Sequence, residues 1–241
     1  MRYALAIWLF MATASQAAVT QFWKLDDNAA STTVVATTGT NATLAGGDNT
    51  SVKQTGSGPG GSITYAFDLN GSDDYVDFAA SAVSFADGAA FSVSAWVNLD
   101  ALTAEVLVGR AGSATRYVRV DTSTSIRVYI GGATADYTVP TMSTGTWYHL
   151  LITRAATSNS TRVFLNGTES STGAQTQSGA MDLDAIGRTS LAFGDGRISQ
   201  VRIYNSDESA NVATIYAEGV DSGIVHDPIV TPESGLDTII K

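Results

Sequence analysis

Hydrophobic and polar residues alternate along most of the chain between residues 91 and 204. In FSVSAWVNL, 91–99, the apolar side chains at odd positions share one face, and three polar residues share the other face with Trp96. The stretch WYHLLITR, 147–154, alternates in the same way and places His149 on the same face as its tryptophan. A period of two is typical of strands that bury one face, so both segments are predicted to be β-strands.

Turn sequences separate such strands at short intervals. YAFDL and DYVDF flank the turn LNGSD, and TSTS joins RYVRVD to SIRVYIGG. Roughly a dozen strands without a βαβ rhythm predict a β-sandwich or barrel.

Residues 28–62 are predicted to be mostly irregular, with one short strand near Thr43 and Leu44. Residues 206–219 are the one good helix candidate, capped by Ser206 or Asp207.

The charge balance narrows the set of expected partners. The chain has 241 residues, with 13 basic and 23 acidic side chains and a net charge of −10. Nucleic-acid binding depends on clustered Lys and Arg, so no nucleic-acid partner is expected. No segment after the N-terminus is apolar enough to cross a membrane. The length suits one large all-β domain with short appendages.

The two ends of the chain differ from the rest. Residues 1–17 combine Arg2, an apolar run and the small-x-small sequence SQA, which is the pattern of a cleaved signal peptide. The predicted organisation is a signal peptide at 1–17, a β-domain at 18–219 and a tail or docking segment at 220–241. The predicted location is secreted or cell surface. Because the chain has no cysteine, the domain would fold there without disulfides.

The order of the motifs resembles the laminin-G-like, concanavalin A-like lectin-glucanase jelly-roll superfamily, in particular its bacterial or phage type. The matching segments are FWKLDD, 22–27, FDLNGSDDYVDF, 67–78, FSVSAWVN, 91–98, TGTWYHLLITR, 144–154, VFLNGT, 163–168, IGR, 186–188, and GRISQVRIYN, 196–205. The resemblance implies an all-β fold, namely a two-sheet antiparallel jelly-roll sandwich with one short C-terminal helix. It also implies that ligands bind at a rim or on the concave sheet.

Motifs of known hydrolases are missing from the sequence. His149 has no Gly-x-Ser-x-Gly elbow with which to form a relay. Glycoside hydrolysis needs two carboxylates about 5–9 Å apart, and no Glu begins the Glu-x-Asp-x-x-Glu series that some enzymes of this fold carry. The chain is therefore expected not to be an enzyme, and the alternative is that carboxylates from distant loops converge.

Calcium is the candidate cofactor, because oxygen-rich loops at the rim of an acidic sandwich suit a hard cation. The predicted metal ligands are Asp27, Asp74 and Asp195. The resemblance implies a metal between the N-terminal loop and the start of the last strand, although this chain has Ser199 where relatives often have an aspartate. The alternative is that these aspartates cap turns through hydrogen bonds to the backbone.

The predicted ligand-binding residues are Trp96, Asp74 and Tyr129. Trp96 shares its strand face with serines and an asparagine, which is the composition of a partly hydrated surface, and Tyr117 and Tyr137 are expected beside Tyr129. Aromatic rings can form apolar platforms for sugars. The alternative is that these rings pack under loops that cover the sheet.

Two functions remain open from the sequence. The leading one is a secreted, non-enzymatic module that binds a glycan or a protein surface, with Ca²⁺ assisting. The competing one is a structural subunit of an extracellular filament, virion or surface assembly. In that case the N-terminus or the tail 220–241 would self-associate by strand addition, since a lone binding module has little need of IVHDPIV or DTIIK.

Overall fold

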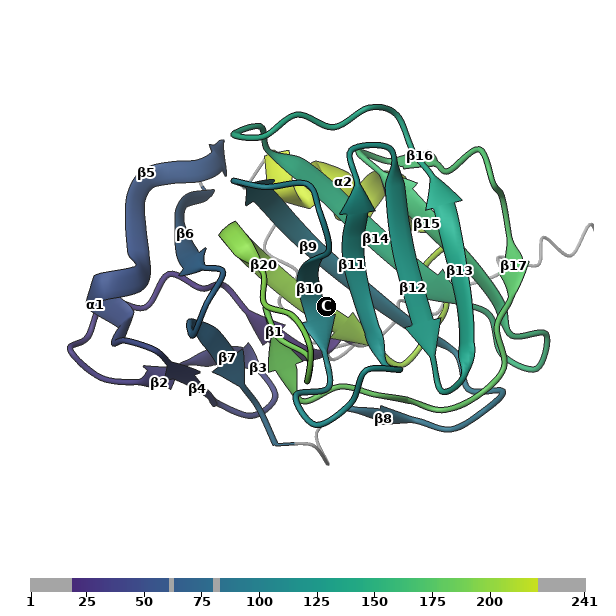
Figure 1. The fold of residues 1–241 in the computed structure, drawn as a ribbon, viewed down its shortest axis with the longest axis horizontal. Coiled ribbons are helices and arrows are strands. Elements are labelled where there is room, and N and C mark those ends of the chain that lie inside the picture. The colour runs from purple at the N-terminus through teal and green to yellow at the C-terminus, as the bar shows by residue number, and fades with distance from the viewer. Residues whose placement is uncertain (1–18, 61–62, 80–82, 221–241) are drawn as a thin grey trace, which may run out of the picture.

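The computed structural model describes residues 19–60, 63–79 and 83–220, which fold into two large antiparallel sheets packed face to face (Figure 1). The two-sheet antiparallel sandwich implied by the resemblance is therefore confirmed. The predicted signal peptide at 1–17, and the predicted tail apart from its first residue, lie outside the described residues. In the described part of the chain, no helix has the length and apolar character to cross a membrane.

One sheet has ten strands. Its main path runs through β16 (Thr168–Glu169), β15 (Ser160–Leu165), β14 (Tyr148–Arg154), β9 (Phe91–Leu99), β20 (Asp195–Tyr204), β1 (Val19–Trp23) and β3 (Ala36–Thr38). Three further strands join it, because β17 (Gln175–Thr176) pairs with β15, β6 (Ile63–Asn70) pairs with β20, and β5 (Lys53–Gly60) pairs with β6. The expected strands around 91–99 and 147–154 lie side by side at its centre.

The other large sheet has eight strands. Their order is β13 (Ala133–Thr138), β12 (Ser125–Ile130), β11 (Tyr117–Thr122), β10 (Glu105–Gly109), β19 (Ala185–Ile186), β7 (Tyr75–Asp77), β4 (Ala42–Ala45) and β2 (Thr33–Val34). β18 (Met181–Asp182) pairs with β8 (Ser84–Phe85), and the helices are α1 (Asn49–Val52) and α2 (Val212–Val220). Figure 1 looks onto the outer face of the eight-stranded sheet, with β10 to β13 in front of β9, β14 and β20.

The main core lies between the two sheets. Alternate residues of β9, among them Phe91, Val93 and Val97, point into it, as their spacing predicts. Val118 on β11 and Ile126 on β12 meet them from the eight-stranded sheet, and all five are at most 2% exposed. Burying each such side chain contributes about 1.5–3 kcal/mol to the free energy of folding.

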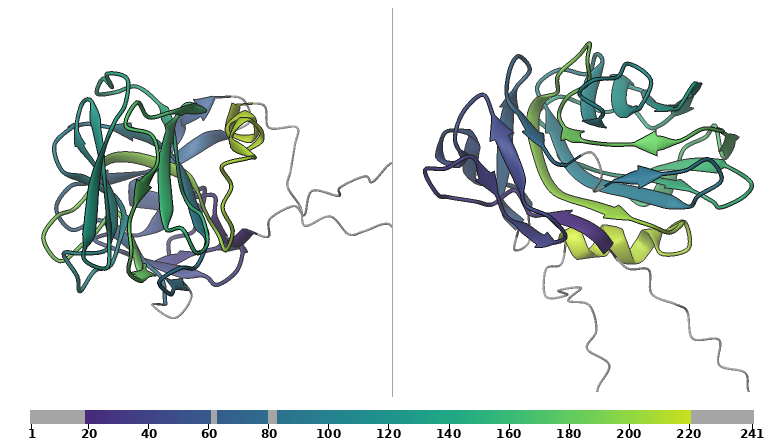
Figure 2. Two further views of the ribbon diagram at one scale, coloured as in Figure 1. Left: turned by 90° about the vertical axis from the view of Figure 1, so that its right-hand side faces the viewer. Right: turned by 90° about the horizontal axis from the view of Figure 1, so that it is seen from below.

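A second apolar cluster covers the outer face of the ten-stranded sheet. Leu151, Phe164 and Tyr204 on the strands pack against Val212 and Ile215 of α2. Figure 2 shows α2 lying against β20 and β1, on the side away from the eight-stranded sheet. The centre of the ten-stranded sheet is thus buried on both faces.

The helix begins later than the sequence predicts. It starts at Val212, and Ser206 and Asp207 lie outside it. The reason is a hydrogen-bonded turn before the helix, in which Ser206 Oγ donates to Glu208 Oε1 (2.6 Å) and Asn211 Nδ2 donates to Glu208 Oε2 (2.7 Å). These bonds give Glu208 partners in a non-helical conformation, and so the helical turn forms only afterwards.

Residues 28–62 contain more regular structure than the sequence predicts. The expected short strand near Thr43 and Leu44 is present as β4, but β2, β3, α1 and β5 also form. Part of this segment is fixed by side chains of β1, because Trp23 Nε1 donates to Thr40 O (3.1 Å) and Gln21 Oε1 accepts from Thr40 N (2.9 Å). Small polar residues give no periodic signal for such pairing.

A buried arginine joins β14 to two loops. Arg154 is 0% exposed, and its guanidinium donates to Ala89 O (2.9 Å), Gly179 O (2.7 Å) and Ala86 O (2.7 Å). It also lies over the ring of Phe91, 4.7 Å from the ring centroid. Burial lowers its pKa, so the charge is tolerated only because carbonyl oxygens surround it.

Candidate functional site

One row of paired residues crosses the outer face of the eight-stranded sheet. Tyr129 pairs with Tyr117, Tyr117 with Gly109, Gly109 with Ala185, and Ala185 with Asp77. Paired residues of an antiparallel sheet point to the same face, and the residues next to them along each strand point into the core. The row therefore has aromatic rings at one end, no large side chain in the middle and a carboxylate at the other end.

The aromatic end of this row combines two tyrosines with an arginine. The rings of Tyr117 and Tyr129 meet edge to face, with centroids 5.6 Å apart and an interplanar angle of 79°. The guanidinium of Arg119 lies 5.0 Å from the Tyr117 ring centroid. Tyr117 is buried whereas Tyr129 is half-buried, so Tyr117 supports a ring that stays open to solvent on one side.

A ladder of ion pairs surrounds the two tyrosines. Arg127 donates to both oxygens of Asp136 (2.6 and 2.8 Å) and lies 3.0 Å from Asp121, which also pairs with Arg119. The bonds from Arg127 hold the pKa of Asp136 below its usual value, and these carboxylates raise the pKa of Arg127 in turn. The two arginines and two aspartates balance each other, so this end of the face is polar with little net charge.

Sequence reasoning singled out Tyr129 on this face and missed both arginines. The signal was present, because in RYVRVD and SIRVYIGG the alternation puts Arg119 beside Tyr117 and Arg127 beside Tyr129. Tyr137, which was expected with them, lies instead in the core at 0% exposure, where its hydroxyl donates to Thr161 O (3.2 Å) or Gln177 Oε1 (2.9 Å). Burial raises the pKa of Tyr137, which keeps the hydroxyl protonated.

The interpretation of the Trp96 face as partly hydrated was wrong. Trp96 is 4% exposed, and Ser92 and Ser94 beside it are also buried. The indole stacks on Tyr216 of α2, with centroids 5.7 Å apart and an interplanar angle of 23°. Because the helix covers this face, Trp96 forms part of the packing between sheet and helix and offers no open platform to a ligand.

His149 is buried in the same interface. It is 0% exposed, its Nε2 lies 2.8 Å from Ser94 Oγ, and its Nδ1 has no hydrogen-bond partner among the described residues. Burial and the nearby charge of Arg202 lower its pKa to about 3. A neutral histidine that is fully buried under a helix has no access to a substrate.

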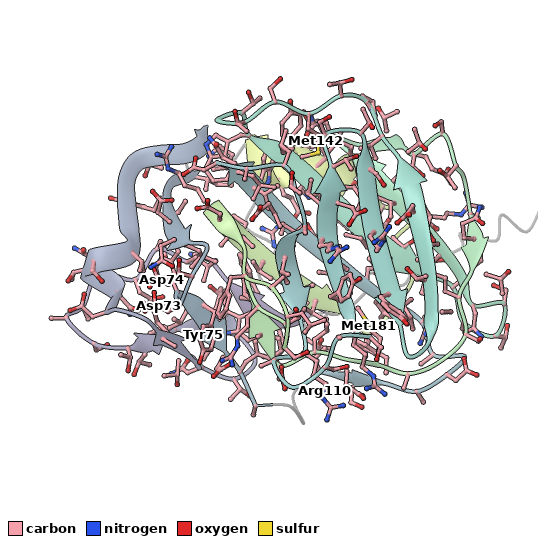
Figure 3. All side chains as sticks on the ribbon, in the orientation of Figure 1. Asp73, Asp74, Tyr75, Arg110, Met142 and Met181 are labelled. Atoms are coloured by element: carbon pink, nitrogen blue, oxygen red, sulfur yellow. The ribbon has the colours of Figure 1, made fainter. Side chains whose placement is uncertain are left out.

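Several carboxylates crowd at one rim of the sandwich. Figure 3 labels Asp73 and Asp74 where β6 ends and β7 begins. Asp195 lies at the start of β20, where its N–H donates to Glu105 Oε2 (2.8 Å). Burial raises the pKa of Asp74, Glu105 and Asp195, and neighbouring carboxylates raise each further. These carboxylates therefore repel one another in their charged forms.

The predicted calcium ligands do not form one set. The carboxylate of Asp27 accepts from the backbone N–H of Val35, with 3.2 Å to each oxygen, as a turn-capping aspartate does. Across the ranges that the structure describes, no three Asp, Glu or His side chains are grouped so that they could hold a metal ion. The arrangement of Asp27, Asp74 and Asp195 thus does not fit a shared cation site.

Two large antiparallel sheets packed face to face define the protein as a β-sandwich. A laminin G family model, described as the concanavalin A-like lectin/glucanases superfamily, matches residues 70–216. The chain belongs to this superfamily, as the order of its motifs indicates. The description of the superfamily names both lectins and glucanases, so membership alone does not decide between binding and hydrolysis. A search of curated proteins found no match.

Several solved structures share the fold at low sequence identity. Domain 4 of AbnA, a GH43 extracellular arabinanase from Geobacillus stearothermophilus, in complex with arabinotriose, is 20% identical, with a TM-score of 0.56; 83% of this chain and 98% of that one are covered. Trypanosoma rangeli sialidase is 14% identical, with a TM-score of 0.55, and 82% of this chain aligns with 32% of it. Botulinum neurotoxin type C, whose cell entry depends on two ganglioside molecules, is 12% identical, with a TM-score of 0.51 and coverages of 83% and 50%.

Proposed function

We propose that this protein is a non-enzymatic glycan-binding module that uses the outer face of its eight-stranded sheet. The observation that carries the proposal is the half-buried ring of Tyr129, backed by Tyr117 and bordered by the ladder of Arg119, Arg127, Asp121 and Asp136. An aromatic ring held rigidly beside fixed donors and acceptors suits the alternating apolar and hydroxyl faces of a sugar.

The similar structures support this choice over a protein ligand. Domain 4 of the arabinanase has nearly the same extent as this domain and was solved with arabinotriose, and the neurotoxin interacts with gangliosides. Their identity to this chain is low, so these likenesses support the ligand class and leave the particular sugar to experiment. The location that we propose is extracellular, in keeping with the signal-peptide pattern at 1–17.

Affinity electrophoresis in gels containing arabinan, dextran or other neutral polysaccharides tests the proposal. We expect retardation of the native protein by at least one of them. Tyr129→Ala should weaken that binding about tenfold, the scale of one lost aromatic contact, whereas Tyr129→Phe should retain most of it because the ring stays. Arg162→Gln, a change on the ten-stranded sheet, is the control and should bind as the native protein does. Equal retardation of Tyr129→Ala and native protein would contradict the proposed face.

Hydrolysis is the competing function, and one observation favours it. Glu105 and Asp195 are close at the rim, and the pKa of each is raised, as general acids of glycosidases require. Glu105 is only 6% exposed, however, and its carboxylate is engaged by the backbone of Asp195. Incubating native protein and Glu105→Gln with the same polysaccharides decides the matter: release of reducing ends by the native protein alone would overturn the non-enzymatic proposal.

A further inference from the structure

A second aromatic cluster lies on the same outer face, and we define it as Tyr75, Arg188 and Phe193. The guanidinium carbon of Arg188 lies 4.2 Å from the ring centroid of Tyr75 and 5.7 Å from that of Phe193. The two rings have centroids 6.1 Å apart, and all three side chains are half-buried. A guanidinium between two rings is held in a fixed orientation by cation–π contacts.

The cluster adjoins the row described above. Arg188 pairs with Phe193 across the loop between β19 and β20, and this loop packs on β10 at Gly109. A Cβ at Gly109 would lie only 2.5 Å from Arg188 O, so the close approach requires glycine there. Because Gly109 pairs with Tyr117, the loop that carries Arg188 lies next to the aromatic end of the face.

Arg188 differs from the other described arginines in having no polar partner. Its Nε is buried without an acceptor, and its side chain forms no hydrogen bond or ion pair with any described residue. The remaining arginines in the described ranges each donate to a carboxylate, a backbone carbonyl or a side-chain amide oxygen: Arg110, Arg116, Arg119, Arg127, Arg154, Arg162, Arg197 and Arg202.

The positive charge of Arg188 affects the pKa of Asp77, the carboxylate at the end of the row. Burial raises the pKa of Asp77, the charge of Arg188 partly offsets that rise, and Asp184 adds to it. Asp77 acts on Arg188 through its charge and forms no ion pair with it, so it lowers the local positive charge without occupying the planar donor edge of the guanidinium. This edge matches the two oxygens of a carboxylate or a sulfate.

We infer that Arg188 binds an oxyanion of an acidic glycan, with Tyr75 and Phe193 as flanking apolar walls. This inference rests on the proposed glycan function and assigns the ligand class as uronic-acid or sulfated polysaccharide. The preorganised guanidinium loses little conformational entropy on binding. The net charge of −10 opposes a polyanion at long range, but at physiological salt that repulsion is screened beyond about 8 Å, so a local contact can still form.

Affinity electrophoresis with five probes tests the inference: polygalacturonate, its methyl ester, dextran sulfate, dextran and polyglutamate. We expect the native protein to bind polygalacturonate at least about tenfold more tightly than the methyl ester, which lacks the charge. If the oxyanion of the natural ligand is a sulfate, the native protein should instead bind dextran sulfate more tightly than dextran. Arg188→Gln should abolish the preference, Arg188→Lys should retain part of it, and Arg162→Gln, with the same change in charge, should leave it intact.

The outcomes separate this inference from the proposed function. If the native protein binds neutral polysaccharide through Tyr129 but does not prefer either acidic probe, the Arg188 site is refuted and the proposed function stands. If it binds no polysaccharide, both fail. Retardation by polyglutamate alone, lost in Arg188→Gln, would overturn the glycan assignment in favour of an acidic polypeptide. The comparison of polygalacturonate with its ester uses the native chain, so it holds even if a variant does not fold.

Discussion

Protonation of His149 should destabilise the fold as the pH falls. The ring is fully buried between β9, β14 and α2, with one nitrogen bonded to Ser94 and the other without a partner among the described residues. Burial first, and then the charge of Arg202, lower its pKa from 6.5 to about 3. The unfolded chain therefore binds a proton at a pH where the folded chain does not, and stability decreases below the unfolded pKa.

The size of this effect follows from the two pKa values. Each pH unit between them changes the free energy of unfolding by about 1.4 kcal/mol. The other titrating groups and the salt concentration affect native and variant protein alike. The contribution of His149 is therefore best measured as the difference between their free energies of unfolding. Between about pH 7.5 and about pH 4.5 we expect His149 alone to account for a loss of about 3 kcal/mol in the free energy of unfolding. Stability is complete above the unfolded pKa and decreases as the pH falls below it towards the folded pKa.

Urea unfolding of native protein and His149→Gln at several pH values tests this prediction. The variant loses ring contacts with Trp96 and Tyr216, so it should be less stable at neutral pH. Its free energy of unfolding should nevertheless fall less steeply with acid, and the gap between the two proteins should narrow by about 3 kcal/mol by about pH 4.5. His226 is present in both proteins, so its contribution cancels in the difference. Parallel stability curves would show that His149 is protonated in the folded protein and would refute the reasoning.

Three further predictions follow from other residues. Arg154→Met should lower the free energy of unfolding by about 2–4 kcal/mol, because carbonyl oxygens lose their donor. Arg162→Met, at a half-buried surface ion pair, should change it by less than about 0.5 kcal/mol in the same urea experiment. Asp74→Asn should raise the melting temperature at neutral pH, since burial and Asp73 disfavour the charge, and this gain should vanish in acid; a lower melting temperature at neutral pH would contradict it. Millimolar Ca²⁺ should shift the melting temperature by less than about 1 °C relative to chelator, because Asp27, Asp74 and Asp195 are not grouped around one point; a larger, chelator-reversible shift would restore the calcium prediction.

The fold could be predicted because its strands alternate over long stretches. In β9 the period of two identifies the core face correctly from Phe91 to Leu99. The same period could not show what lies against Trp96 on the other face, because a second buried face and a hydrated face both contain serine and asparagine. Only the docking of α2, through a contact between residues 96 and 216, decides between them. Such long-range contacts leave no local pattern in one sequence.

The candidate site was predicted only in part for a related reason. Tyr129 was predicted as a ligand-binding residue, and the structure places it half-buried on the outer face of the eight-stranded sheet, whereas Arg188, in the short motif IGR, was not among the predicted residues. Its significance arises from Tyr75, which lies more than a hundred residues earlier, and from Phe193 across a loop. The aspartates show the converse, since their acidic loops and the family resemblance suggested a common site for Asp27, Asp74 and Asp195, which are not grouped as a metal site among the described residues.

The position of α2 explains why we place binding on the eight-stranded sheet. A two-sheet sandwich has two outer faces, and a ligand needs one that is open. The ten-stranded sheet has its outer face closed by the stack of Tyr216 on Trp96 and by the packing of Val212 and Ile215. The eight-stranded sheet has no described helix on its outer face. The arginines beside its two tyrosines are paired with Asp121 and Asp136, whereas Arg188 forms no ion pair with a described carboxylate. Because those arginines are already paired, Arg188 is the cation of this face at which one ligand can be distinguished from another.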